Sequence, residues 1–226
     1  MREVVIDTET TGLSFNRGDR IIEVGCVELI NHVSTGNTLQ FYCAVDKKID
    51  DSAAKVHGIT NEFLTNQPQF NKNVNKFLEF ISNDTLIIHN AEFDLGFINN
   101  ELKILGLPGV KNKIIDTVDF ARKKLNSRIA NLDYLCRRFS IDLSDRKLHG
   151  ALLDSQLLAE VYLELRGGKQ IDMNLKNTDT KTSPKDNIAK KSNHVFLKIK
   201  PTKNEILQHK TNIKPIKDSL WEKIDY

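Results

Sequence analysis

The sequence predicts a mixed α/β sheet with helices packed on it. Three segments rich in Val, Ile, Phe and Tyr come first, at residues 3–8, 21–30 and 37–45. Two shorter apolar segments, 84–90 and 114–116, then alternate with helical patterns. Because a run of strands precedes strand–helix alternation, we expect five strands in one sheet, with an antiparallel meander at the N-terminus.

Turn sequences and apolar periodicity place the remaining elements. The turns expected between the first three strands are "NRGD" (16–19) and "STGN" (34–37). The last expected helix ends at Gly167 and Gly168, which are a helix stop. The expected helices lie near residues 51–56, 60–65, 70–82, 91–105, 117–125, 131–139 and 150–165.

Charge divides the 226-residue chain into an acidic body and a basic tail. Residues 1–168 hold 20 Lys and Arg against 23 Asp and Glu, whereas residues 169–226 hold 13 Lys against 7 Asp and Glu. The tail begins with a polar, lysine-rich stretch that cannot bury enough apolar surface to order itself. We therefore expect a folded domain over 1–168, a flexible linker over 169–194 and a partner-binding segment over 195–226; simple solvation of the tail is the alternative.

Cysteine usage and the N-terminus favour a cytoplasmic protein. Cys26, Cys43 and Cys136 lie far apart and form no Cys-x-x-Cys pair, which favours reduced, buried thiols over a zinc site or disulfides. The N-terminal "MREVVID" carries acidic residues where an apolar leader would stand, so no signal peptide is expected. No apolar run approaches the ~18 residues that span a membrane, so no membrane partner is expected.

Carboxylates gather at the boundaries of the buried elements. Asp7 and Glu9 follow an apolar strand and, at a spacing of two, point the same way. Asp94 lies one turn into the helix after "IIHN", and Asp154 lies on an otherwise apolar helical face. Each alone is more often a solvated acid. Together they form a set of hard oxygen ligands that divalent ions such as Mg²⁺ prefer.

Two divalent ions held by four carboxylates would relieve the mutual repulsion of these like charges. They could also clamp a phosphodiester for in-line displacement. His149 lies five residues before Asp154, about 140° away around a helix, so both can face one site if His149 lies at or before the first turn of that helix. A neutral imidazole is available near pH 7 and can take a proton from the attacking water as general base. A helix-capping role is the ordinary alternative for this histidine.

Three motifs in order resemble those of the DnaQ-type 3′→5′ exonucleases, the DEDDh group: "IDTETTGL" (6–13), "HNAEFD" (89–94) and "HGALLDS" (149–155). "VHGIT" (56–60) matches a further family segment, and the resemblance covers residues 3–168. Within the group the chain is most similar to the proofreading epsilon subunits of bacterial DNA polymerase III. The resemblance implies a ribonuclease H-like sheet, Mg²⁺ or Mn²⁺ ligands at Asp7, Glu9, Asp94 and Asp154, and His149 as general base.

The resemblance also implies substrate contacts around the same motifs. Some relatives place a Glu at the position of Ser52, so either Ser52 or the neighbouring Asp51 is expected to touch the terminal sugar. For His57 the alternative is a loop histidine that orders its own segment. The substrate-binding residues implied are Asp7, Thr8, Glu9, Thr10, Leu13, Ser52, His57, His89, Phe93 and Asp154.

The tail resembles partner-binding segments of the same subunits. "QIDMNL" (170–175) resembles a sliding-clamp peptide, with Gln170, Met173 and Leu175 as its anchors. The segment from Val195 to the C-terminus resembles the tether to the polymerase alpha subunit, with Phe196, Leu220 and Trp221 as apolar anchors. Whether a small accessory subunit docks on the body is left open.

The function implied is proofreading: removal of nucleoside 5′-monophosphates from a frayed or single-stranded DNA 3′ end during replication. Two alternatives use the same features. One is an RNA 3′-end-trimming exonuclease of the ribonuclease T type, which the tail argues against. The other is a mainly structural subunit that stabilises the polymerase, which the intact set of five candidate residues argues against.

Overall fold

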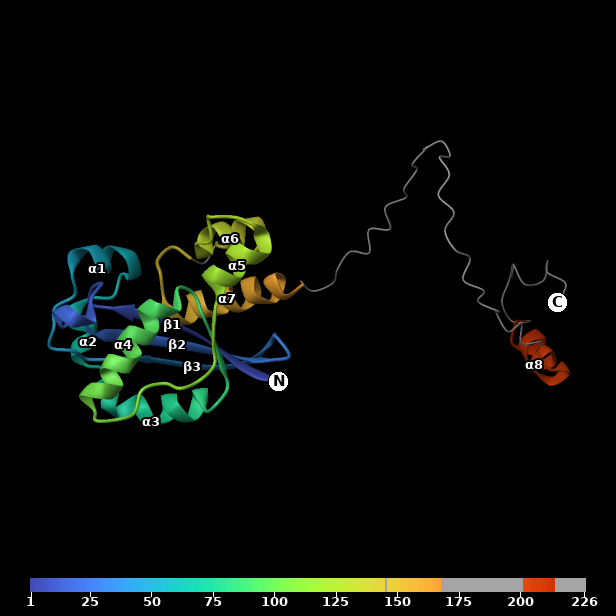
Figure 1. The fold of residues 1–226 in the computed structure, drawn as a ribbon, viewed down its shortest axis with the longest axis horizontal. Coiled ribbons are helices and arrows are strands. Elements are labelled where there is room, and N and C mark those ends of the chain that lie inside the picture. The colour runs from blue at the N-terminus through green and yellow to red at the C-terminus, as the bar shows by residue number, and fades with distance from the viewer. Residues whose placement is uncertain (145, 168–200, 214–226) are drawn as a thin grey trace, which may run out of the picture. The chain divides into compact units, whose positions relative to one another are not determined.

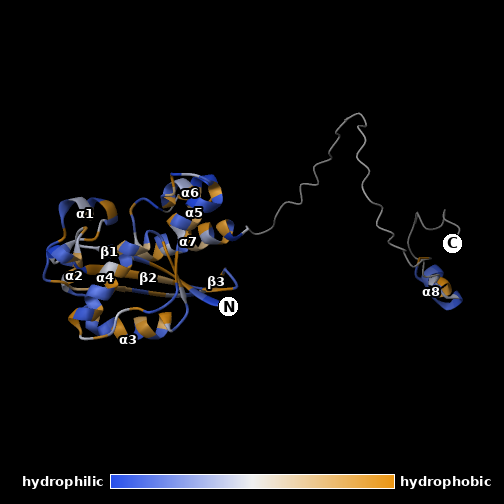
Figure 2. Cartoon of the chain, in the orientation of Figure 1, coloured by the Kyte–Doolittle hydropathy of each residue, from blue (hydrophilic) through white to orange (hydrophobic). Residues whose placement is uncertain are grey.

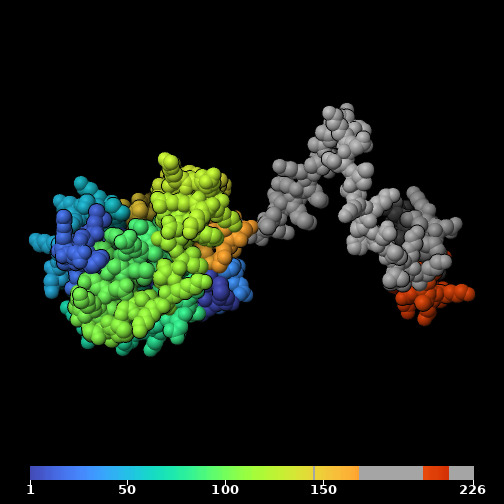
Figure 3. All heavy atoms as spheres, in the orientation of Figure 1, coloured from blue at the N-terminus to red at the C-terminus, as the bar shows by residue number. Residues whose placement is uncertain are grey.

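The computed structural model describes residues 1–144, 146–167 and 201–213 (Figures 1 and 3). The chain divides into two units, Met1–Asn174 and Leu175–Tyr226. The tail residues predicted to bind the clamp and the polymerase lie outside the described residues, so those roles stay predictions; they are Gln170, Met173, Leu175, Phe196, Leu220 and Trp221.

Five strands form one mixed sheet in the order β3-β2-β1-β4-β5, as predicted. β1 pairs antiparallel with β2, and β2 with β3, whereas β4 runs parallel to both β1 and β5. The carboxyl ends of β1, β4 and β5 therefore meet at one edge, where ligands of α/β proteins bind. The strands are β1 (Arg2–Thr10), β2 (Ile21–Ile30), β3 (Val33–Tyr42), β4 (Thr85–Ile88) and β5 (Ile114–Asp116).

Helices cover both faces of the sheet (Figure 1). α3 and α4 pack on one face, and α5, α6 and α7 pack on the other. Among the described residues, no helix is both long and apolar enough to cross a membrane. The helices are α1 (Asp51–His57), α2 (Asn61–Thr65), α3 (Phe70–Ile81), α4 (Ala91–Ile104), α5 (Thr117–Leu125), α6 (Leu132–Arg138), α7 (Ala151–Arg166) and, in the second unit, α8 (Lys203–Ile213).

The alternation of β1 decides which face each side chain meets. Val4 and Ile6 are buried with the α3–α4 layer, whereas Val5 is buried with the α5–α7 layer. The strands accordingly form the hydrophobic centre of the body in Figure 2. Because the period is two, the next odd-numbered residues, Asp7 and Glu9, face the α7 side, and Thr8 faces the α4 side.

The turn predicted at "STGN" is wrong: residues 34–37 lie inside β3. The chain reverses instead at Asn31 and His32, which have φ of 51° and 71°. Two consecutive residues with positive φ make the turn that matches the twist of a hairpin. Gly36, at φ 84°, lies where the β2–β3 register slips, so its glycine signal marks a bulge.

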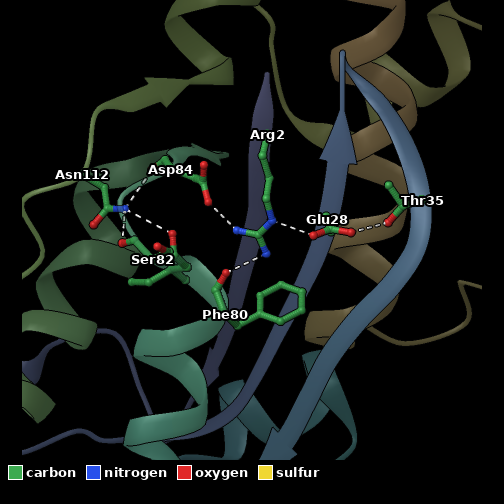
Figure 4. A network of polar contacts seen from close by, with 8 residues as sticks. Arg2, Glu28, Thr35, Phe80, Ser82, Asp84 and Asn112 are labelled. Atoms are coloured by element: carbon green, nitrogen blue, oxygen red, sulfur yellow. Dashed lines mark hydrogen bonds and ion pairs between the residues drawn. The ribbon is translucent and has the colours of Figure 1, made fainter.

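Arg2 ties the amino end of β1 to its surroundings (Figure 4). Its Nε donates to Glu28 of β2 at 2.5 Å, one Nη pairs with Asp84, and the other donates to the Phe80 carbonyl at 2.9 Å. Asn112 bonds the same α3–β4 loop, since its amide donates to the carbonyls of Ser82 and Asp84. This network anchors the end of the sheet away from the candidate site.

Two smaller outcomes concern local sequence signals. The three cysteines are free and buried, as predicted. α8 and a 3₁₀ turn at Phe15–Arg17 were not predicted. The remaining helices agree with prediction to within one residue at each end.

Candidate active site

β1 and α7 bring three of the predicted carboxylates together. Asp7 lies opposite Gly25 of β2, and the backbone of α7 runs over that glycine, because a Cβ built there would lie 2.2 Å from the Ala151 carbonyl carbon. Asp154, in the first turn of α7, is 4% exposed. Ligand atoms of Glu9, Asp154 and His149 all lie within 4.8 Å of one another.

Asp94 reaches the cluster from the opposite face of the sheet. It lies in the first turn of α4, is buried, and accepts a hydrogen bond from the Thr8 hydroxyl at 2.6 Å. Asn90, at φ 64°, begins this turn, and the Asp116 carboxylate accepts from the backbone N–H groups of Asn90 and Ala91. Thr8 thus orients Asp94, and Asp116 fixes the turn that presents it.

His149 lies two residues before α7, so the condition for it to share a site with Asp154 is met. Its side chain is 45% exposed and its Nδ1 lies 3.1 Å from an Asp154 oxygen. Its backbone N–H donates to the Val56 carbonyl at 3.0 Å, and the Leu148 side chain lies against Gly58. These contacts tie the loop that carries His149 to α1.

The carboxylates repel one another. Burial, with the charges of Asp94 and Glu9, raises the pKa of Asp7 well above its ordinary value. Burial and the nearby Asp154 raise the pKa of Glu9 to about 8, and burial raises that of Asp94 to about 7. Asp154 behaves oppositely: burial would raise its pKa, but the hydrogen bonds that Arg146 donates, together with the nearby His149, hold it below the ordinary value.

Two cavities adjoin the cluster. One, of about 340 Å³, is lined by Asp7, His89, Asp133, Arg146, His149 and Asp154 among others. The other, of about 240 Å³, is lined by Thr8, Glu9, Leu13, Ser52, His57 and Phe93 among others. The carboxylates therefore lie between two hollows, one bearing the histidine and the other bearing most of the residues predicted to hold the nucleotide.

The residues predicted to touch the substrate are divided between the two cavities. His89 lines the histidine-bearing cavity, not the one that Phe93 lines. Ser52 lines the second cavity, whereas Asp51 stands at the exposed first turn of α1. Thr10 also lines it, although its hydroxyl is engaged with the Gly12 carbonyl at 2.6 Å.

His57 offers a hydrogen-bond donor to the second cavity. Its Nδ1 accepts from the Ile59 backbone N–H at 3.0 Å, which leaves the proton of the neutral ring on Nε2. Burial lowers the pKa of His57, so the neutral ring is favoured. Among the described residues the buried Nε2 makes no hydrogen bond of ordinary geometry, and the neighbouring Thr10 backbone acts to raise the pKa of the ring. An unsatisfied buried donor costs about 1–3 kcal/mol, which a ligand oxygen would remove.

Sequence reasoning missed three charged residues here. Arg146 forms a two-bond ion pair with Asp154, Asp116 caps α5 and holds the α4 turn, and Glu23 lies opposite Glu9 on β2. Glu23 had a signal, since it stands between apolar residues early in the predicted strand 21–30, and the structure buries it to 2% exposure. Asp116 had a signal only as the N-cap of the predicted helix 117–125, not as the partner of the α4 turn, and Arg146 had none, because its partners lie in other elements.

The donor set fits divalent metal ions. Four carboxylates at one edge of the sheet supply hard oxygen ligands, and their raised pKa values mark repulsion that a cation would relieve. Neither a buried thiol nor a histidine pair lies among these ligands, so the set suits Mg²⁺ or Mn²⁺ better than zinc.

A mixed sheet with acidic residues and an exposed histidine, His149, at this edge is typical of a nuclease site. The Exonuclease family model matches residues 4–162. The DNA polymerase III epsilon subunit of Rickettsia felis is 43% identical over 216 residues, covering 93% of this chain and 94% of that protein. The chain belongs to this family of 3′→5′ exonucleases, whose members depend on divalent metals.

Two further comparisons agree with this assignment. The epsilon subunit of Salmonella typhimurium is 45% identical over 176 residues, covering 74% of this chain and 72% of that protein. The nuclease domain of 3′hExo, a DEDDh family member solved with rAMP, superposes with a TM-score of 0.64 at 19% identity. It covers 73% of this chain and 91% of its own, which supports the ribonuclease H-like fold predicted from sequence.

Proposed function

We propose that this chain is the proofreading subunit of a replicative DNA polymerase III in the cytoplasm. In this role it hydrolyses the terminal phosphodiester of a DNA 3′ end and releases a nucleoside 5′-monophosphate. The observation that carries the proposal is the convergence of Asp7, Glu9, Asp94, His149 and Asp154 at one sheet edge, beside a cavity of about 240 Å³. Relatives named epsilon subunits, which match nearly the whole chain, support the assignment.

Two divalent ions, Mg²⁺ or Mn²⁺, would be held by Asp7, Glu9, Asp94 and Asp154, and would supply charge stabilisation to the phosphoryl group and the departing oxygen. His149 accepts the proton of the attacking water on Nε2, while its Nδ1 faces Asp154 at 3.1 Å. The water oxygen bonds to phosphorus, the bond to the 3′ oxygen breaks, and that oxygen takes up a proton.

The cavity lined by Leu13, Ser52, His57 and Phe93 would hold the terminal nucleotide. The Phe93 ring and the 82%-exposed Leu13 offer apolar contact to a base, and His57 Nε2–H offers a donor to the sugar. A mismatched end separates from its template at a lower free-energy cost than a paired end, so it enters the cavity more often. Selectivity therefore follows from melting of the end.

The enzymatic proposal predicts a specific pattern of cleavage. Full-length protein with Mg²⁺ should shorten 5′-labelled DNA stepwise from its 3′ end, faster on a mismatched than on a matched primer–template. EDTA should abolish cleavage, and His149→Ala should slow it on the order of 10²–10⁴-fold, the usual contribution of a general base. Cleavage resolved on a sequencing gel measures this, with Arg137→Ala as a matched surface control. Cleavage of RNA 3′ ends but not DNA would contradict proofreading.

The tail is proposed to carry two separable partner sites: Gln170, Met173 and Leu175 for the sliding clamp, and Phe196, Leu220 and Trp221 for the polymerase alpha subunit. Alanine at all three polymerase positions should weaken alpha binding on the order of 100-fold, because buried aromatic anchors dominate such interfaces. Alanine at the clamp positions should leave alpha binding unchanged. Biosensor measurements of alpha binding by the two full-length variants test these expectations. Wild-type affinity for alpha in the variant with alanine at the polymerase positions would contradict the proposed tether. Impaired cleavage of single-stranded DNA by either variant would contradict the separation of the tail from the active site.

A further inference from the structure

Arg146 contacts the candidate metal site closely, and none of the roles proposed above uses these contacts. Its side chain is only 7% exposed, although it belongs to the loop between α6 and α7. Nε and Nη2 donate to the two oxygens of Asp154 at 2.6 and 2.7 Å. Nη1 pairs with Asp133, and Nη2 lies 3.0 Å from His149 Nδ1. One guanidinium therefore joins a proposed metal ligand to the proposed base.

The bond to Asp154 uses the oxygens that a metal ion would need. A bidentate guanidinium–carboxylate pair engages both carboxylate oxygens with charge-assisted hydrogen bonds. The pair is almost fully buried, since Asp154 has a side chain 5% exposed. Within this cluster Asp154 is also the carboxylate whose charge is already compensated, because Arg146 supplies the cation. A divalent ion at Asp154 would therefore compete with this two-bond contact, both for the carboxylate oxygens and through repulsion between the two cations.

The same guanidinium influences which ring nitrogen of His149 carries the proton. His149 Nδ1 can donate to Asp154 at 3.1 Å or accept from Arg146 Nη2 at 3.0 Å, but a neutral ring does only one at a time. If Nδ1 accepts, the ring proton lies on Nε2, and Nε2 cannot receive the proton of an attacking water. If Arg146 withdraws, Nδ1–H can donate to Asp154, and the Nε2 lone pair becomes free.

We propose that Arg146 is a positioning residue that occupies Asp154 when no metal is bound and yields this carboxylate to the incoming divalent ion. This inference rests on the proposed function in taking Asp154 as a metal ligand and His149 as the base. Withdrawal of Arg146 frees His149 Nδ1 in the same movement, so metal entry and readiness of the base are coupled. Asp133 can hold the withdrawn guanidinium, because its side chain already pairs with Arg146, is 45% exposed and lines the same cavity.

The contact has a clear physical benefit for the metal-free protein. Asp7, Glu9, Asp94 and Asp154 carry like charge in a buried site, and an arginine that neutralises one of them limits their repulsion. Leaving a buried carboxylate without its partner is strongly destabilising. Arg146 therefore stabilises the metal-free fold at the expense of metal affinity.

Calorimetric titration of metal-free, full-length protein with Mn²⁺ or Mg²⁺ alone tests the proposal. Arg146→Ala should bind metal about tenfold more tightly than wild type, and the control Arg137→Ala, an exposed arginine on α6, should match wild type. Arg146→Lys keeps the charge but cannot form the two-bond contact. It should also bind more tightly than wild type, by a smaller factor.

The remaining outcomes separate this inference from the proposed function. Wild-type affinity in Arg146→Ala, or tightening in Arg146→Ala with none in Arg146→Lys, overturns the role of the ion pair. Asp154→Asn should lose the metal site, and undiminished binding in that variant would overturn the proposed site itself. Nitrogen-15 shifts of His149 in metal-free protein should show the proton on Nε2 in wild type and on Nδ1 in Arg146→Lys; the reverse overturns the coupling.

Discussion

Asp7→Asn should lower the rate of cleavage about 10³-fold or more and yet raise the melting temperature of the metal-free protein. The loss of rate follows because Asp7 faces Asp154 across the site, and an amide binds divalent metal far less well than a carboxylate. A 10³-fold loss corresponds to about 4 kcal/mol of transition-state stabilisation. The gain in stability follows because the substitution removes one of several buried, mutually repelling charges.

The sign of this stability effect follows from the raised pKa values. The pKa of Asp7 lies well above its ordinary value, and that of Glu9 is about 8. The folded protein therefore holds these protons more tightly than the unfolded chain, whose Asp and Glu have pKa values of about 4. The free energy of unfolding of the metal-free protein must fall as pH rises from about 4 towards 8. Asp7→Asn should flatten that fall.

Thermal melting in EDTA between pH 5 and 8.5 measures this prediction. Relief of about 1–2 kcal/mol at pH 8 corresponds to a rise of roughly 2–8 °C in a chain of this size. Asp119→Asn, at an exposed position on α5, is the matched control and should leave both rate and melting curve unchanged. A lower melting temperature for Asp7→Asn in EDTA, or retained cleavage, would count against the site as described.

The fold was predictable because local pattern and tertiary packing agree. β1 shows this: the residues that alternate in its sequence also divide between the two core layers, Val4 and Ile6 on one side and Val5 on the other. The hairpin turn was mislocated because Gly36 suits both a turn and a bulge. Asn31 and His32 could have indicated the turn, since both residue types are enriched at positive φ, but the glycine at position 36 was the stronger turn signal.

The site was predictable to the extent that its residues lie in short motifs. Asp7, Glu9, Asp94, His149 and Asp154 were chosen from sequence, and the structure brings them to one edge of the sheet. Their supporting contacts were not predictable. Thr8, predicted to contact the nucleotide, lines the second cavity and also donates its hydroxyl to Asp94, 86 positions away, and no periodicity encodes such a partner. Arg146 escaped notice because an arginine in a polar loop is ordinary until its burial is known.

Gly25→Ala should be among the most destabilising single substitutions in the body, although it adds one methyl group. A Cβ at this position would lie 2.2 Å from the Ala151 carbonyl carbon and 2.3 Å from both the Ala151 oxygen and the Leu152 nitrogen. All three are backbone atoms of α7, so no side chain can rotate away. The helix is also bonded to this point, since the Ser155 hydroxyl donates to the Gly25 carbonyl at 3.0 Å.

Relief of this overlap requires α7 to move away from β2, and that movement carries Asp154 away from Asp7, which lies directly opposite Gly25. We therefore expect two losses together: about 3 kcal/mol or more of stability, a fall of roughly 6–12 °C in melting temperature, and weaker metal binding. Gly150→Ala is the matched control, because position 150 has φ −157° and a Cβ there meets nothing within 4 Å.

Melting curves and metal titrations of the two alanine variants distinguish packing from a general intolerance of substitution near the site. Gly150→Ala should melt within about 2 °C of wild type, because its backbone suits any residue. A stable Gly25→Ala protein with normal metal affinity would mean that α7 can slide on the sheet without cost. In the described structure the contact between α7 and Gly25 sets the approach of Asp154 to Asp7. That result would mean instead that bound metal ions, and not this helix–strand contact, determine the geometry of the site.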